Sequence, residues 1–514
     1  MDLDDTWTEL ETVSKYERVY PETTIPVATL AHGLDRTLFK PGVHPLKDLT
    51  SKRHRFTPYL ENITQPEDFD YEAIQPYITS SKDKNLIQMA KDQKARYVGS
   101  TSSLSGILSH LYFKISNYRP VDISFLSRGF ANQSKNHTRG SRVPKTILLR
   151  WKDGIYGVDV DKSFDTKDTI LSNLGKSMEK VLTMEPKEYE RYLKKNSSMV
   201  TEEERNAPEA YAYGRLGSLF LRSQLDCYHQ SLPRRTFDLK TRATMPIRLD
   251  IPHYQDYLNY KLEQHHGLHY SFEREYYDMM RSAFLKYSFQ VRIGHMDGIM
   301  VAYHNTENIF GFQYIKRSEM DARLFGTSKM GDEVFQHSLN LMQTIFDKAT
   351  TQYPKQPVSD EQEKRMNDDS DDKDQGDLPT IADIKIDDPA YDPLCDQVTM
   401  YHLHTTSFLN GKKIEGPVSV NNESDVWDVC YKLEDMKSIP NDTIRNEFRR
   451  VRYNQATVFL PQSDESPKFL QRFKLKRSEY RKNNNDDDNS DNADDDKSTE
   501  SPPRNLETPS TTST

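Results

Sequence analysis

Residues 219–248 constrain the fold of this chain more than any other stretch. Leu219, Leu221, Ser223 and Leu225 alternate with Phe220, Arg222, Gln224 and Asp226, and a period of two is typical of a β-strand. A break around Pro233 is followed by a second strand-like run over 236–243. The sequence therefore predicts a hairpin over 219–243.

Two carboxylates and a lysine are expected to meet on one face of this hairpin. Asp238 and Lys240 are two positions apart, so both side chains point to the same side of the sheet. Asp226 ends the first strand, close enough to face the same side. Buried charges are costly unless they bind something, and carboxylates suit Mg²⁺, which leaves its other positions to water and a substrate phosphate. The residues alone thus indicate an acid–lysine site compatible with phosphate chemistry.

The spacing of these residues resembles a known nuclease signature. Asp226, eleven residues, and then Asp238–Leu239–Lys240 is similar to the PD-(D/E)XK motif of restriction-endonuclease-like phosphodiesterases. The longer strings LRSQLDC, FDLKTRA and PIR resemble the fungal mitochondrial RNA 5′-end-processing proteins of the petite-complementing group. This resemblance is densest over roughly 145–320 and much more specific than the catalytic triplet alone.

The resemblance implies a fold, an activity and a site. The fold is a restriction-endonuclease-like α/β core, a mixed sheet flanked by helices, with N- and C-terminal extensions. The activity is that of a metal-dependent 5′→3′ exoribonuclease. Asp226, Asp238 and the main-chain carbonyl of Leu239 would bind Mg²⁺ (or Mn²⁺), while Lys240 positions or deprotonates the attacking water. A helix expected over 165–182 would add Glu179 to this site. An ordinary role for Glu179 stays equally open, because further glutamates follow closely on a second helix: Glu185, Glu188 and Glu190.

The resemblance also implies a location and partners. The location is the mitochondrial matrix, with peripheral inner-membrane association, and the partners are single-stranded RNA and the mitochondrial RNA polymerase or other processing factors. The N-terminus, MDLDDTWTELE, is acidic, whereas transit peptides are rich in Arg and poor in acids. No apolar run has the length needed to cross a bilayer.

Net charge is unevenly distributed along the chain. The formal charge is -9, but 359–377 carries nine acids against three bases and 483–514 carries nine against two, which leaves +4 for the remainder. Seven basic and no acidic residues occur over 127–152, and arginines alternate with aromatics over 445–481. Both segments suit single-stranded RNA. The first equally suits a solvated basic loop, and the second equally suits a packed surface whose basic side chains extend into solvent.

Composition divides the 514 residues into five expected parts. They are a helical and loop-rich extension (1–144), the nuclease-like core (145–350), a disordered acidic insertion (354–379), a β-rich basic region (380–482) and a disordered tail (483–514). Three cysteines without paired spacing exclude a disulfide framework or a zinc knuckle: Cys227, Cys395 and Cys430.

Several local patterns complete the prediction. Hairpins are expected at Asp153–Gly154 and Asn410–Gly411, and strands over 298–304 and 309–315 should follow a helix over 271–289. On that helix or just after it, Arg274, Arg281 and Gln290 either reach a scissile phosphate or lie on the helix surface. His402 and His404 share one strand face and would suit a metal, although no third ligand is evident and a structural role is favoured.

Two alternatives to a ribonuclease stay open at this point. One is a non-catalytic RNA-binding or scaffold protein with the same fold, against which the two acids and the lysine weigh. The other is a DNA nuclease of the same fold.

Overall fold

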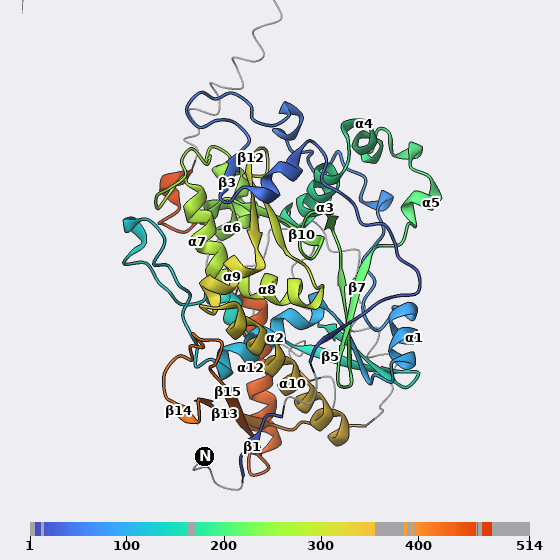
Figure 1. Ribbon diagram of the computed structural model, residues 1–514, viewed down its shortest axis with the longest axis vertical. Helices are drawn as coiled ribbons and strands as arrows, with labels where there is room; N and C mark the ends of the chain where they lie inside the picture. Colours follow the sequence, from blue (N-terminus) through green and yellow to red (C-terminus); the bar gives the residue numbers. More distant parts are fainter. Residues whose placement is uncertain are drawn as a thin grey trace, which may run out of the picture.

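In the part of the chain that it describes, the computed structural model contains three β-sheets joined by helices (Figure 1). It describes residues 6–11, 15–161, 170–354, 385–387, 392–393, 397–458, 460 and 465–474. Most of the expected acidic insertion and the whole of the expected tail from 483 lie outside these described residues.

A five-stranded mixed sheet carries the Asp238–Lys240 motif. Its strand order is β3 (Val43–Pro45), β12 (Ile309–Lys316), β11 (Gly298–His304), β10 (Thr236–Ala243) and β9 (Cys227–Tyr228). β10 runs parallel to β11, whereas the other neighbours are antiparallel. Asn305 closes the β11–β12 turn because its Oδ1 accepts from the backbone N of Asn308 at 2.8 Å. The two strands predicted over 298–315 are therefore confirmed.

A second, six-stranded sheet lies beside it, in the order β2 (Glu17–Val19), β7 (Tyr211–Leu216), β8 (Leu219–Gln224), β4 (Tyr97–Ser100), β6 (Ile155–Val160) and β5 (Ile147–Lys152). The β5–β6 hairpin turns at Asp153 (φ 51°) and Gly154 (φ 93°), as expected. Two successive residues with positive φ form the turn that matches the strand twist, and Asp-Gly favours it.

The single hairpin predicted over 219–243 is wrong. β8 pairs with β7 and β4 in the six-stranded sheet, and only the short β9 pairs with β10, where Cys227 lies opposite Phe237. The physical reason is that the β8 residues from Leu219 to Ser223 are all buried. β8 is therefore an interior strand, and the chain passes from one sheet to the other at Leu225–Asp226.

Helices fill the space between the sheets and cover their outer faces. α2 (Thr101–Ile115), α8 (Phe284–Ile293) and α10 (Ser328–Gln352) pack against one another or against β8 and β11 in the largest apolar cluster. The helix expected over 271–289 is two helices, α7 (Phe272–Ser282) and α8, because Ala283 leaves the helical conformation (φ −130°). The remaining α-helices of the described residues are α1 (Lys84–Asp92), α3 (Ile170–Thr183), α4 (Pro186–Tyr189), α5 (Glu202–Arg205), α6 (Met245–Leu249), α9 (Arg317–Leu324) and α12 (Asn441–Thr457).

A third sheet lies at the lower end of the molecule in Figure 1, with the order β1 (Thr8–Glu9), β15 (Trp427–Asp435), β13 (Tyr401–Leu409) and β14 (Lys412–Ile414). The expected turn at Asn410–Gly411 is confirmed. The sheet is fixed to α2, since Ser407 Oγ donates to the carbonyl of Ile115 at 2.8 Å. The C-terminal region therefore packs directly on the helix that supports the core.

The expected α/β core is confirmed, while the domain boundaries stay a prediction. β3 and β4 come from the expected N-terminal extension, yet they are strands of the two large sheets. Among the described residues, every helix is too short or too polar to span a bilayer.

Candidate active site

β10 places three charged side chains in a row on one face of the five-stranded sheet. Asp238, Lys240 and Arg242 alternate with the buried Phe237 and Leu239. Asp238 is only 1% exposed. The ammonium group of Lys240 forms an ion pair with Asp238 and donates to the main-chain carbonyl of Leu239 at 3.1 Å. The predicted shared face of Asp238 and Lys240 is therefore confirmed.

Asp226 reaches this site from the junction between the two large sheets. It follows β8 and directly precedes β9, and its Oδ2 accepts a hydrogen bond from the backbone N of Leu239 at 2.8 Å. The pairing of β9 with β10 holds it there. Asp226 therefore lies beside β10, as expected from the sequence, but the strands that bring it there differ from the predicted hairpin.

Glu179 approaches from α3. The apolar stripe of this helix anchors it against β10, because both contribute to one buried cluster that includes Leu174, Met178, Leu182, Phe237 and Leu239. Glu179 lines a cavity of about 490 Å³ together with Asp226 and Leu239. The structure therefore gathers all four predicted site residues, while their roles stay a proposal.

The carboxylates repel one another in this enclosed setting. Burial raises the pKa of Glu179 to about 7, and the Asp238 charge adds to the rise while Lys240 opposes it. Burial and the charges of Asp238 and Glu179 raise the pKa of Asp226 as well. Burial alone would lower the pKa of Lys240, but the attraction of Asp238 and Asp226 outweighs it and raises this pKa.

This donor set fits a divalent cation. Three carboxylates and one carbonyl are oxygen ligands of the kind that Mg²⁺ and Mn²⁺ prefer. Asp238 Oδ2 is buried without a hydrogen bond, although it faces the Lys240 ammonium. A cation would offset the repulsion that raises the carboxyl pKa values.

Gln290 also contacts the site. The sequence offered it only as one of three candidates, beside Arg274 and Arg281. Its Nε2, on α8, donates to Asp238 Oδ1 at 2.7 Å. The two other candidates point elsewhere: Arg274 pairs with Asp278 at 3.1 Å and Arg281 donates to the carbonyl of Asn136 at 2.7 Å. No periodic signal distinguishes these three residues, because Gln290 reaches Asp238 only through the packing of α8 against β8 and β11.

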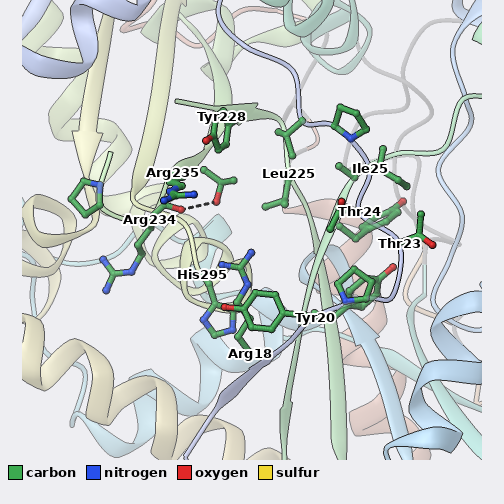
Figure 2. A pocket seen from close by; sticks show the side chains of 18 residues that line it. Arg18, Tyr20, Thr23, Thr24, Ile25, Leu225, Tyr228, Arg234, Arg235 and His295 are labelled. Carbon is green, nitrogen blue, oxygen red and sulfur yellow. Dashed lines mark hydrogen bonds between the residues drawn. The ribbon is translucent and has the colours of Figure 1, made fainter. Parts of the chain in front are cut away.

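A second cavity of about 820 Å³ adjoins the first (Figure 2). The two share lining residues, which are Pro26, Val27, Ala210, Tyr211 and Leu225. In Figure 2, Arg234 and Arg235 lie on one side of this cavity and Thr23 to Ile25 on the other. Arg18 lies 4.9 Å from the ring centroid of Tyr20, and Tyr228 adds a further ring. Arginines and aromatic rings together are the usual surface for single-stranded nucleic acid.

The two basic segments expected from the sequence meet in the structure. Arg139 and Arg142 line a cavity of about 280 Å³ opposite Asn454 and Val458. Two of the basic residues are instead structural: Arg150 pairs with Asp159 at 3.2 Å, and Arg452 pairs with Asp161. Only some of the basic residues in 127–152 and 445–481 are therefore available to contact RNA.

The fold and the site together define a class. It is a mixed α/β core with one acid at a strand junction and an acid-X-lysine triplet on the next strand, the arrangement that the sequence resemblance implied. The family model described as mitochondrial protein Pet127 matches residues 77–347, and the chain belongs to this family. The mitochondrial family indicated by the sequence strings is thus confirmed.

Two relatives extend this finding. The mRNA degradation protein pet127 of Schizosaccharomyces pombe, a mitochondrial protein, is 37% identical over 348 residues, which covers 66% of this chain and 66% of that protein. PET127 of Saccharomyces cerevisiae is 37% identical over 314 residues, covering 57% of this chain and 37% of that protein. The chain therefore matches just under two thirds of the first relative's length and little more than a third of the second's.

Solved structures resemble the chain only distantly. Candida albicans Rai1 in complex with pU5 and Mn²⁺ is 10% identical with a TM-score of 0.30, covering 85% of this chain and 100% of that one. Scheffersomyces stipitis Rai1 with (3′-NADP)⁺ and calcium is 9% identical with a TM-score of 0.30, covering 68% and 87% respectively.

Proposed function

We propose that this protein is a metal-dependent ribonuclease that acts in mitochondrial RNA 5′-end processing and degradation, with 5′→3′ exonuclease polarity. One observation carries the proposal: Asp226, Asp238 and Glu179 come from a strand junction, a strand and a helix, and they surround Lys240. The name of the Schizosaccharomyces pombe relative, an mRNA degradation protein, supports RNA as the substrate.

The oxygen atoms of Asp226, Asp238, Glu179 and the Leu239 carbonyl would hold Mg²⁺, or Mn²⁺. When bound, such an ion offsets charge on the phosphate and lowers the pKa of a coordinated water. Gln290 orients Asp238 through its 2.7 Å hydrogen bond. Leu239 orients Asp226 in the same way through its backbone N.

Lys240 has two tasks in this scheme. Without a metal its ammonium group neutralises Asp238 and satisfies the Leu239 carbonyl. During hydrolysis the same cation is available to align the attacking water and to offset the negative charge that develops on the phosphate. Its raised pKa keeps it protonated at neutral pH, which favours charge stabilisation over a role as general base.

The adjoining cavity would receive the RNA strand. Arg18, Arg234 and Arg235 would contact phosphates, and Tyr20 and Tyr228 would stack on bases. Because this cavity shares a wall with the carboxylate cavity, one strand can lie in both. The meeting point of Arg139 and Arg142 with α12 offers a further basic surface.

A scaffold function is the second candidate. The Lys240 ammonium already neutralises Asp238 without any metal, so the cluster is compatible with a protein that binds RNA and does not cleave it.

End-labelled RNAs test the proposal directly. Linear RNAs with a 5′-monophosphate or a 5′-triphosphate and a circular RNA of the same sequence are incubated with the protein, with Mg²⁺ or with EDTA. The expected result is Mg²⁺-dependent release of nucleotides from the 5′ end of linear RNA, with the circle intact. Cleavage of the circle would instead indicate an endonuclease, and no cleavage with any divalent metal would favour the scaffold.

A further inference from the structure

A second group of metal-ligating side chains lies on the C-terminal sheet, away from the carboxylate site. His402 and His404 are two positions apart on β13, so they share one face. Their ring centroids are 5.7 Å apart. The sequence indicated this pair and found no third ligand beside it.

The structure supplies the third ligand from β15. Glu434 is the direct cross-strand partner of His402 in the antiparallel ladder, and its Oε2 lies 3.2 Å from Nε2 of His404. One ligand atom from each of the three residues lies within 4.8 Å of the others. The signal for Glu434 is the strand register, which no sequence pattern specifies.

The opposite face of β13 packs against α2. Thr405 and Ser407 donate to carbonyls of α2, Ser407 at 2.8 Å. The histidines therefore lie on the face directed away from α2, where His402 and Glu434 are exposed and His404 is half-buried. Packing against the core does not explain two imidazoles and a carboxylate at this place.

The ligand set selects the class of metal. Two imidazoles and one carboxylate suit Zn²⁺ and its transition-metal neighbours, whereas Mg²⁺ prefers oxygen ligands. Bond lengths of about 2.0–2.2 Å require the three ligand atoms to close to roughly 3.4 Å from one another. Small side-chain rotations can bring the ligand atoms to this spacing, because the site is exposed. Lys432 lies opposite His404 in the ladder, but its long side chain can extend into solvent and keep its positive charge away from the metal.

We propose that His402, His404 and Glu434 form a Zn²⁺-class site that links β13 to β15. Three protein ligands leave one coordination position for water or for a donor from another molecule. Because the site connects the two central strands of the third sheet, bound metal stabilises that sheet. This site is independent of the proposed nuclease activity.

The test uses the full chain without an affinity tag, with Asp238→Asn as background so that the carboxylate site contributes little. Zn²⁺ binding is measured by competition with a chromogenic chelator, and Co²⁺ absorption reports the ligand geometry. Thermal unfolding is followed with Zn²⁺ and with Mg²⁺. The variants are His404→Ala and Glu434→Gln, and the matched control is His266→Ala, whose side chain is 79% exposed.

The proposal predicts one Zn²⁺ per chain, a rise in melting temperature with Zn²⁺ but not with Mg²⁺, and an unchanged result for His266→Ala. His404→Ala and Glu434→Gln should each weaken Zn²⁺ binding at least about 100-fold. Even the loss of a residue that only hydrogen-bonds to a metal ligand typically costs roughly 10–100-fold in metal affinity. Circular dichroism verifies that each variant is folded. If His404→Ala or Glu434→Gln does not fold, His402→Gln is measured in its place. Equal Zn²⁺ affinity in the ligand variants and the control would overturn the proposal, as would the absence of stoichiometric binding.

Discussion

Gln290 on α8 donates to Asp238 on β10 across a distance of 2.7 Å, although the two residues are 52 positions apart in the chain. This hydrogen bond uses Oδ1 of Asp238 and leaves Oδ2 directed to Lys240. The Gln290 amide therefore fixes the orientation of the Asp238 carboxylate in the proposed metal site.

Gln290→Leu removes this donor and keeps the side-chain volume. Because the Asp238 carboxylate loses its orientation, the Mg²⁺ concentration for half-maximal RNA cleavage should rise roughly 10–100-fold. This is the usual effect of losing a residue that hydrogen-bonds to a metal ligand. Single-turnover cleavage measured over a range of Mg²⁺ concentrations checks this. An unchanged Mg²⁺ dependence would show that Asp238 does not need Gln290.

Lys240→Met should separate metal binding from turnover. The ammonium group occupies two oxygens that the metal would use, on Asp238 and on Leu239. Its removal should leave Mg²⁺ affinity equal or tighter, while cleavage falls by roughly 10²–10⁴ because the transition state loses a cation. Isothermal titration with Mg²⁺ and single-turnover kinetics on one preparation measure both quantities. A parallel loss of affinity and rate would contradict the two separate tasks of Lys240.

Glu179 should make the metal-free protein sensitive to pH. Burial and Asp238 raise its pKa from 4.5 to about 7 in the folded state, so the folded state binds more protons than the unfolded state across that interval. Stability should therefore fall as pH rises from about 4.5 to 7 and change little above it. Glu179→Gln removes the ionisation, so its stability advantage over wild type should grow through the same window. Urea denaturation in EDTA at pH 5 and pH 8 measures the difference, and an advantage that is equal at both values would refute this origin.

The cavity shown in Figure 2 should contribute RNA affinity and not chemistry. Arg18→Ala combined with Arg234→Ala should raise the Kd for single-stranded RNA of any sequence. It should also reduce the salt dependence of log K by about 0.7 for each phosphate that the variant no longer neutralises. The rate at saturating RNA should stay close to wild type. Lys437→Ala, on an 84% exposed lysine, is the control, and equal salt slopes in all three proteins would place the RNA elsewhere.

Local patterns predicted the parts of the fold that short-range chemistry specifies. Asp153–Gly154 and Asn410–Gly411 fold into turns because their residue types accept positive φ. The alternation on β10 correctly placed Asp238 and Lys240 on one face. Both kinds of signal depend on residues within a few positions of one another.

Contacts between residues far apart in the chain determine the features that the sequence did not predict. Arg222 has the spacing of a solvent-facing strand residue, yet it is 1% exposed and forms an ion pair with Asp83, 139 positions away. The partition of β8 and β10 between two sheets has the same origin. β4 and β7 pair with the two edges of β8, and its two faces are buried in separate apolar clusters, Leu219 and Leu221 in one and Phe220 in the other. Gln290 and Glu434 likewise reach their partners only through helix packing and strand register.

Asp238→Asn is the decisive variant for the nuclease assignment. The substitution keeps the side-chain shape and removes one anionic ligand, so metal occupancy and hydrolysis should both fall. The measurement is single-turnover decay of a 5′-monophosphate RNA in Mg²⁺, beside a binding titration of the same preparation. Asp153→Asn, in the exposed β5–β6 turn, is the matched control.

We expect Asp238→Asn to fold, to bind RNA with unchanged Kd and to cleave it roughly 10²–10⁴-fold more slowly, while Asp153→Asn behaves as wild type. Cleavage by Asp238→Asn at the wild-type rate would contradict the assignment of this carboxylate cluster as the nuclease site.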